Sequence, residues 1–501
     1  MIFRFTAYLL LLLFGGACAG DGYPYSGEEE GETATDMVRL NVIFVTSQAG
    51  ASRSPGNGTR GTDGELDKEP ATDEENRVAT ALVVLGALPK GAAAPDAVHS
   101  VHDISEFKRL PDGRWSGEIS ATQGSYRLLV VVNPTEGIRA ALRDAAGLPW
   151  NDMLLKAYRA EKYTELSQIW KDGSFLMTNA YQNDVKESDA ELVSGKDNSV
   201  TVHVQRACAR FDFQPTKEGN VYEIGASIDG KSVTLSVKLQ KARLVNASRG
   251  FHLFKQICSD DTGINPTVYA HESGNNYVYD TDWNEKKRVI GEENIREAAG
   301  LFFLSSEVSG TDGYRPLPTD KGNYSFMFYC PENTIPGIAR QVNCLSTGIV
   351  FGGGFTVPDS DASELYYIEK KGRLFYRSLD KLKEEHSLEL SGTDDEALAE
   401  AGIRHFKKGE DGTFPVWYTY WNRHNDNGDP IRMGVMEFAV VRNYVYKLQV
   451  NSISSFGLPK DPGSGGNPWK PSGNTPDELG PQLDVTVTVA GWTDRTYDTD
   501  I

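Results

Sequence analysis

The chain has 501 residues and a formal net charge of −19, and 39% of its residues are hydrophobic. This length exceeds what one hydrophobic core supports, so two domains are expected. The 70 acidic residues outnumber the 51 basic ones, which disfavours a nucleic-acid backbone as a partner. The 50 Gly and 23 Pro favour many turns over long helices.

The first residues predict export. Arg4 precedes a short apolar run, Leu9–Phe14, which is too short to span a bilayer and is typical of a signal peptide over residues 1–17. Small residues then lead to Cys18, and this pattern resembles the site at which bacterial lipoproteins are cleaved and acylated. A lipid on Cys18 would hold the precursor at a membrane through its buried CH₂ groups.

The remaining cysteines leave the disulfide state open. Four thiols in an exported protein allow two disulfides in three connectivities, or they are buried as small free hydrophobes. None has the spacing of a zinc site, and no metal is expected. The four are Cys208, Cys258, Cys330 and Cys344.

A strand followed by a long polar stretch comes next. Residues 19–36 are rich in Gly and Glu and predict a flexible tether, whereas Val38–Val45 predicts an apolar strand. Residues 47–76 lack hydrophobic periodicity, which predicts a functional or mobile loop. A strand resumes at Val78–Leu85, so the first strand is joined to the rest only through a protease-accessible segment.

The next stretch mixes strand and helix signals. Tyr126–Val132 predicts a buried strand. Asn133-Pro134-Thr135-Glu136 then offers an N-cap with proline at the first helical position, and helical spacing continues to Gly147. A second helix is predicted over Asp152–Ala160.

The second half is predicted to be mostly β. A capping box at Thr393–Glu396 begins one helix, whose end is expected near Lys407–Gly409. Residues 417–441 predict a hairpin around a Gly- and Asp-rich break. Further strands are predicted at Val200–Phe213, Val233–Val245, Tyr324–Tyr329, Ile349–Phe355 and Tyr444–Val450.

A last strand follows a Pro- and Gly-rich spacer at residues 457–480. Strict alternation of apolar and other residues indicates one buried face. This strand is either an edge strand of its own domain or a segment delivered to another molecule. The predicted buried face consists of Leu483, Val485, Val487 and Val489.

Catalytic patterns fall short. The His99/His102 pair lies in a polar stretch, and Gly225–Asp229 misses the nucleophile-elbow pattern because Asp stands where Gly is needed. We therefore predict no enzyme, no catalytic residue and no cofactor. Binding through strand pairing is the remaining interpretation, since a sheet that lacks one strand captures an extended segment from another chain.

Residues 417–450 resemble the C-terminal region of fimbrillins, the subunits of type V pili of Bacteroides-like bacteria, and especially those that build the shaft of the minor fimbrium. Weaker resemblance lies at residues 126–134, 175–179 and 204–213. The resemblance implies a mainly β fold of two transthyretin-like β-sandwich domains with a few short helices. The implied division is a signal peptide at 1–17, a lipidated propeptide with the first strand at 18–60, and sandwich domains at 61–205 and 206–501.

The resemblance also implies a function. Fimbrillin precursors are lipoproteins of the outer membrane that lose their first strand to an arginine-specific protease. A neighbour's strand then fills the groove in an extracellular fimbrium that supports adhesion. Here Arg60 is the expected processing site, with Arg53 and Arg77 as rivals, and Leu483, Val485, Val487 and Val489 form the expected donor strand.

The implied partners are copies of the chain, accessory fimbrial subunits, the protease and membrane lipid bound through Cys18; the adhesion ligand stays unidentified. One alternative is a tip or accessory adhesin of the same system. Another is a surface lipoprotein that binds glycans, and a third is a β-sandwich hydrolase.

Overall fold

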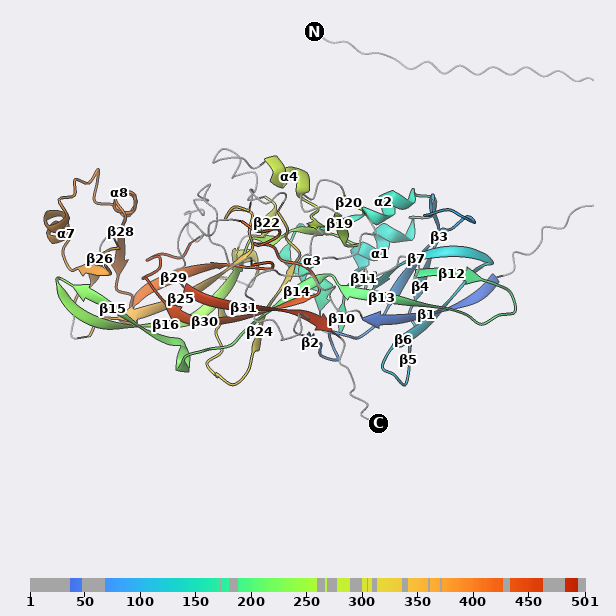
Figure 1. Cartoon of the computed structure of the whole chain (residues 1–501), viewed down its shortest axis with the longest axis horizontal. Helices are drawn as coiled ribbons and strands as arrows, with labels where there is room; N and C mark the ends of the chain where they lie inside the picture. Colours follow the sequence, from blue (N-terminus) through green and yellow to red (C-terminus); the bar gives the residue numbers. More distant parts are fainter. Residues whose placement is uncertain are drawn as a thin grey trace, which may run out of the picture. The chain divides into compact units, whose positions relative to one another are not determined.

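The computed structural model describes residues 37–46, 68–171, 173–179, 188–258, 266–267, 277–288, 300–303, 305–308, 313–335, 341–358, 361–369, 372–426, 433–462 and 483–493. These residues form mainly β-strands with a few short helices (Figure 1). The predicted fold class, a mainly β protein of the β-sandwich type, is confirmed.

The first sheet has the order β4-β3-β7-β11-β13-β1-β6-β5, and β12 pairs with β7. Its inward side chains share one apolar cluster, which includes Leu40, Val83 and Val130. The predicted first strand is confirmed as β1. The strands are β1 (Met37–Thr46), β3 (Ala81–Ala87), β4 (Val98–Ile104), β5 (Lys108–Arg109), β6 (Trp115–Thr122), β7 (Gly124–Val132), β11 (Met177–Asn179), β12 (Asp189–Leu192) and β13 (Asn198–Arg206).

Asn133 explains two differences from the predicted boundaries. It has a φ of 52°, and its Oδ1 accepts from the backbone N–H groups of Ala79 and Thr80 at 2.8 and 3.2 Å. Residues 78–80 are therefore held by a side chain, and β3 begins only at Ala81. The cap of α1 (Glu136–Arg143) is Thr135 and not Asn133, because Thr135 Oγ1 accepts from the Ile138 N–H.

Two further sheets form the second half. One has the order β2-β31-β30-β14-β24, and the other has the order β28-β26-β27-β15-β16-β25-β29 with β23 paired to β16. Their strands are β2 (Lys68–Pro70), β14 (Cys208–Phe213), β24 (Ser325–Pro331), β30 (Tyr444–Ile453), β31 (Leu483–Thr493), β15 (Val221–Ile228), β16 (Lys231–Val245), β23 (Arg315–Pro316), β25 (Gly348–Thr356), β26 (Glu364–Ile368), β27 (Leu374–Tyr376), β28 (Ile403–Lys407) and β29 (Phe414–Trp421).

The predicted hairpin at residues 417–441 is wrong. Its first arm is β29, which pairs with β25, but the second apolar run makes a turn in which Met436 has a φ of 52°. Side chains and single backbone contacts, such as the bridge between Val440 and Asn333, bond this run in place of a full neighbouring strand. Buried Glu437 accepts from the Gly434 N–H at 2.6 Å, and Asn422 donates to the Ala439 carbonyl at 2.8 Å.

The predicted helices are shorter than expected. The chain turns at Gly402, with a φ of 76°, and continues as β28, so α8 does not reach residue 407. Residues 157–159 form a strand and not the end of a helix. The helices are α1, α2 (Trp150–Leu154), α3 (Tyr163–Leu166), α4 (Trp283–Arg288), α6 (Ser305–Val308), α7 (Leu379–His386) and α8 (Asp395–Glu400), and no described helix is long and apolar enough to cross a membrane.

Short strands tie the first half of the chain to the second. β8 (Ala157–Arg159) pairs with β18 (Gly250–His252), and buried Ala207 separates β13 from β14. The other small strands are β9 (Trp170–Lys171), β10 (Ser174–Phe175), β17 (Ala247–Ser248), β22 (Phe302–Phe303), β19 (Gln256–Cys258), β20 (Pro266–Thr267) and β21 (Tyr277–Tyr279).

Cys208, Cys330 and Cys344 are free thiols. Cys208 and Cys330 are fully buried in the adjacent strands β14 and β24. Burial raises the pKa of Cys344 to about 11. These three cysteines therefore act as small hydrophobes, whereas Cys18 and the side chain of Cys258 lie outside the described residues.

Candidate functional site

β1 lies inside its sheet and not at an edge. It pairs in parallel with β13 and antiparallel with β6, over most of its length on both sides (Figure 1). Every second side chain enters the core, because successive residues of a strand point to opposite faces. Val38, Leu40, Val42 and Phe44 are at most 8% exposed. Without β1, the sheet would have a groove with four pockets between β13 and β6.

β31 is the last described strand, and it lies in the five-stranded sheet of its own chain. It pairs antiparallel with β30 from Leu483 to Gly491 and in parallel with the three residues of β2. Leu483 is buried, whereas Val485, Val487 and Val489 are only partly buried against the core. The predicted donor face is thus only partly buried while β31 lies in the sheet of its own chain.

The end of β31 is anchored by Trp492, which is fully buried. The Arg206 guanidinium lies 4.5 Å from the centre of the indole, and the Tyr329 ring stacks on it at 6.0 Å with an angle of 6°. Phe175 meets the indole edge-on at 6.1 Å. Cation–π and aromatic contacts contribute about 0.5–2 kcal/mol each, so Trp492 is held more firmly than the valines of the same strand.

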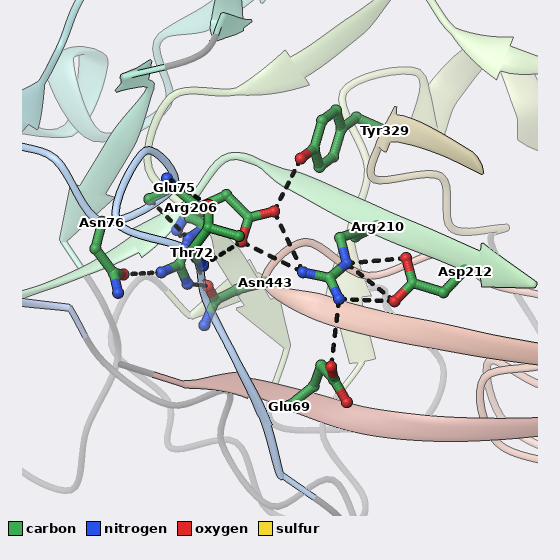
Figure 2. A network of polar contacts seen from close by, with 9 residues as sticks. All are labelled: Glu69, Thr72, Glu75, Asn76, Arg206, Arg210, Asp212, Tyr329 and Asn443. Atoms are coloured by element: carbon green, nitrogen blue, oxygen red, sulfur yellow. Dashed lines mark hydrogen bonds and ion pairs between the residues drawn. The ribbon is translucent and has the colours of Figure 1, made fainter. Parts of the chain in front are cut away.

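Arg210, whose guanidinium lies 5.5 Å from the centre of this indole, belongs to a network of polar contacts (Figure 2). The Arg210 guanidinium donates to Asp212 at 2.7 Å and to Glu75 at 3.2 Å. It also lies 3.4 Å from Glu69, and Glu69 in turn accepts from Lys447 at 2.7 Å.

Arg206 forms a second branch of the network. It donates to the Glu75 backbone carbonyl at 3.1 Å and to Asn443 Oδ1 at 3.2 Å, and it also bonds Asn76. The backbone carbonyl of Asn443 in turn accepts from the Trp492 backbone N–H at 3.2 Å. Figure 2 shows Arg206 between Asn76 and Asn443.

Burial sets the protonation of the network. Burial raises the pKa of Asp212, and hydrogen bonds from Arg210 oppose that rise. Burial also opposes the charge of Arg210, but the hydrogen bonds to Asp212 and the charges of Asp212, Glu75 and Glu69 together outweigh it and raise the Arg210 pKa. Burial and the Glu75 carboxylate raise the pKa of Tyr329, so its hydroxyl stays protonated and donates to Glu75 at 2.8 Å.

The segment at residues 68–76 departs from the sequence-based expectation. It belongs to the stretch predicted to be one loop, yet it pairs with β31 and sends Glu75 into the interior, where it is 3% exposed. A local turn positions this carboxylate, since Glu75 accepts from the Thr72 N–H at 2.7 Å. Residues 68–70 thus join the sheet of the C-terminal half, although the expected division places them in the N-terminal domain.

The structure locates only some of the predicted site residues. Cys18, Arg53 and Arg60 lie outside the described residues. The rival Arg77 is exposed, but its backbone carbonyl accepts from Asn133 Nδ2 at 2.7 Å, and the following Val78 is buried. Among the described residues, no three His, Cys, Asp or Glu side chains gather as metal ligands.

The sequence analysis did not predict the residues of this polar network as a set. Arg206 and Arg210 stood out only through the resemblance at 204–213, and Glu69 and Glu75 were part of a stretch without hydrophobic pattern. The one available signal was a pair of arginines around small residues inside an apolar strand, because buried arginines need carboxylate partners. That signal does not indicate which carboxylates pair with the two arginines.

Comparison with known proteins places the C-terminal part of the chain. Residues 411–498, which contain β29, β30 and β31, match the family model for the C-terminal region of fimbrillin, the major fimbrial subunit protein type IV. No curated protein matches the chain.

Solved structures give more distant likenesses. A candidate cell-adhesion protein of Parabacteroides distasonis has 12% identity and a TM-score of 0.42, over 91% of this chain and 100% of that one. A fimbrillin of Porphyromonas gingivalis has 14% identity and a TM-score of 0.38, over 91% and 98%. The C-terminally truncated tip fimbrial protein Mfa3 of the same organism has 11% identity and a TM-score of 0.35, over 91% and 100%.

Fold and site together define a mainly β protein with several sheets, whose last strand is held by pairing and by an aromatic anchor. The family match shows that residues 411–498 are similar to the C-terminal region of fimbrillins. The resemblance drawn from the sequence is thereby confirmed.

Proposed function

We propose that the chain is a shaft subunit of a cell-surface fimbria that supports adhesion and polymerises by donor-strand exchange. Its precursor is a lipoprotein acylated on Cys18 at the outer membrane. An arginine-specific protease removes β1, and the terminal strand of a neighbouring copy fills the groove. Such a head-to-tail contact does not close on itself and so builds a filament.

The placement of β1 is the observation that carries this proposal. The strand pairs on both sides, so its loss would leave two rows of backbone groups without partners. It would also empty four pockets, which correspond to about 6–12 kcal/mol of apolar burial at about 1.5–3 kcal/mol per side chain. After cleavage within residues 47–67, only non-covalent contacts would hold β1 in the sheet.

β31 matches the vacated groove in its spacing. Leu483, Val485, Val487 and Val489 recur at every second position, as do the four buried residues of β1. Their partial burial also makes them easier to withdraw than a fully buried face. The fit is incomplete at one end, because a smaller side chain would enter the pocket of Phe44, whose ring meets Phe107 at 5.7 Å.

The folded surroundings of Arg77 favour Arg60 as the cleavage site. A protease needs an extended backbone, and the carbonyl of Arg77 is hydrogen-bonded to Asn133. Cleavage at Arg77 would also detach residues 68–76 from the chain that follows. Arg60 precedes that segment and leaves it attached.

The direct test treats purified precursor with an arginine-specific protease and follows SDS-resistant ladders. We expect ladders from the wild type, none from a chain that ends before residue 483, and a changed N-terminus in R60A. Complete cleavage that yields only monomer would refute the proposal. Mass spectrometry of the precursor and mature N-termini tests Cys18 and Arg60 together.

The incomplete fit also reports the direction of the inserted strand. If the donor runs as β1 does, Val489 takes the Phe44 pocket, and V489F should strengthen the ladders against heat in SDS. If it runs the opposite way, L483F should do so instead. Failure of both variants to change ladder stability would contradict the assignment of this face as the donor face.

A further inference from the structure

The structure also contains a strand-docking site outside the β1 groove. Arg206, Arg210 and Tyr329 contact the indole of Trp492. Residues 68–70 pair with the end of β31, and Glu75 of the same segment bonds Arg210 and Tyr329. We propose that this assembly is a clamp for the strand-terminal tryptophan, which keeps β31 in its own subunit after cleavage and must open before the strand is donated. The inference rests on the proposed function and specifies its regulation.

Continuity of the chain is the first argument. Cleavage at Arg60 separates β1 from residue 61 onward, but residues 68–76 stay joined to the subunit. β2 pairs Lys68, Glu69 and Pro70 with Gly491, Trp492 and Thr493. Proteolysis therefore empties the β1 groove without releasing the strand that is to fill the groove of a neighbour.

A balance of charges is the second argument. The clamp contains the cations of Arg206 and Arg210 and the carboxylates of Glu69, Glu75 and Asp212 (Figure 2). Lys447 adds a third cation through its contact with Glu69. Each carboxylate contacts a cation of the set, so removing the segment at 68–76 would leave arginines of the interior with fewer partners. A buried ion pair adds little net stability, but removal of one partner is costly because it leaves an uncompensated buried charge.

Strand counting is the third argument. A subunit that has lost β1 has two places for a terminal strand, the β1 groove and the clamp, but only one β31. Donation of β31 therefore vacates the clamp of the donor and exposes the edge of β30. The indole N–H of Trp492 has no hydrogen-bond partner among the described residues, so withdrawal of Trp492 breaks ring contacts and no hydrogen bond of its side chain.

The test uses the uncleaved precursor, so it does not depend on polymerisation. E69Q removes the carboxylate that reaches both Arg210 and Lys447, and E74Q is the matched control at an exposed neighbour. Hydrogen exchange followed by mass spectrometry reports the opening of β31. We expect exchange in β31 to rise about tenfold in E69Q, as for the loss of one charged hydrogen bond, with no change in E74Q.

β25, in the other sheet of the second half, separates local opening from general loss of stability. Faster exchange in β31 without a rise in β25, followed by earlier ladders after protease treatment, supports the clamp. Equal exchange in E69Q and E74Q, or an equal rise in β25 and β31, overturns it. Wild-type ladders in that case would leave the proposed function standing, whereas cleaved wild type without ladders would refute the function itself.

Discussion

The substitution L40A tests how β1 is held. Leu40 is fully buried and lies between Asn198 of β13 and Ile119 of β6. Truncation of a buried leucine to alanine costs about 2–5 kcal/mol, because transfer energy is lost and a cavity remains. In the precursor the covalent link keeps the strand at a high effective concentration, so the variant should still fold.

After cleavage the same cost acts on a separate peptide. Each 1.4 kcal/mol is about a factor of ten, so β1 should leave the L40A subunit about 30-fold to several thousand-fold faster than the wild type. The control is R39A, since the side chain of Arg39 is 83% exposed and its contact with Glu118 is at 4.0 Å. Such a surface pair contributes about 0–1 kcal/mol.

The assay cleaves each protein to completion and measures the released N-terminal peptide by size exclusion and mass spectrometry over time. We expect rapid release from L40A and nearly wild-type release from R39A, with ladders appearing in the same order. Equal release from the two variants would refute the reasoning that the four core side chains hold β1 in place.

Two further predictions concern stability. Burial lowers the pKa of His424 to about 3, below its unfolded value of about 6.5. The unfolded state therefore binds the proton more readily, and the stability of the fold decreases as the pH drops from 6.5 towards 3. In denaturant titrations the wild type should lose about 2 kcal/mol more than H424Q between pH 7.5 and 5, and an equal loss in both proteins would contradict this. A Cβ on Gly353 would lie 2.0 Å from the Lys238 carbonyl, whereas one on Gly225 meets nothing within 4 Å. G353A should therefore lower the free energy of unfolding by about 1–3 kcal/mol, and G225A should lower it far less. Equal melting temperatures of the two variants would argue against the close strand contact.

Strands with a regular pattern were predictable from the sequence. β1 and β30 were predicted within a few residues, because their apolar side chains recur at the period of a strand. The strand β31 was also predicted, but the pattern overestimated the burial of its valines, and buried Ala490 and Trp492 stand at positions of the opposite face. A period of two indicates which side chains share a face, and it does not tell how well the neighbouring elements cover that face.

Contacts between distant residues were not predictable. Glu75 and Arg210 meet across 135 positions of the sequence, and nothing local to Glu75 distinguishes it from the exposed Glu74 beside it. The wrong hairpin has a related cause, since buried Glu437 satisfies the backbone of an apolar run that would otherwise need a partner strand. In both cases a buried side-chain contact decides the local structure, and the pattern of apolar residues does not indicate it.

The junction at Ala207 has a mechanical consequence. The chain passes from β13 to β14 through this one residue, whose N–H bonds the Leu176 carbonyl at 2.9 Å, and the pairing of β8 with β18 also joins the first half of the chain to the second. Tension applied across the junction is therefore shared by parallel sets of hydrogen bonds, which must fail together. A fibre of such subunits under flow would stretch first where one copy meets the next.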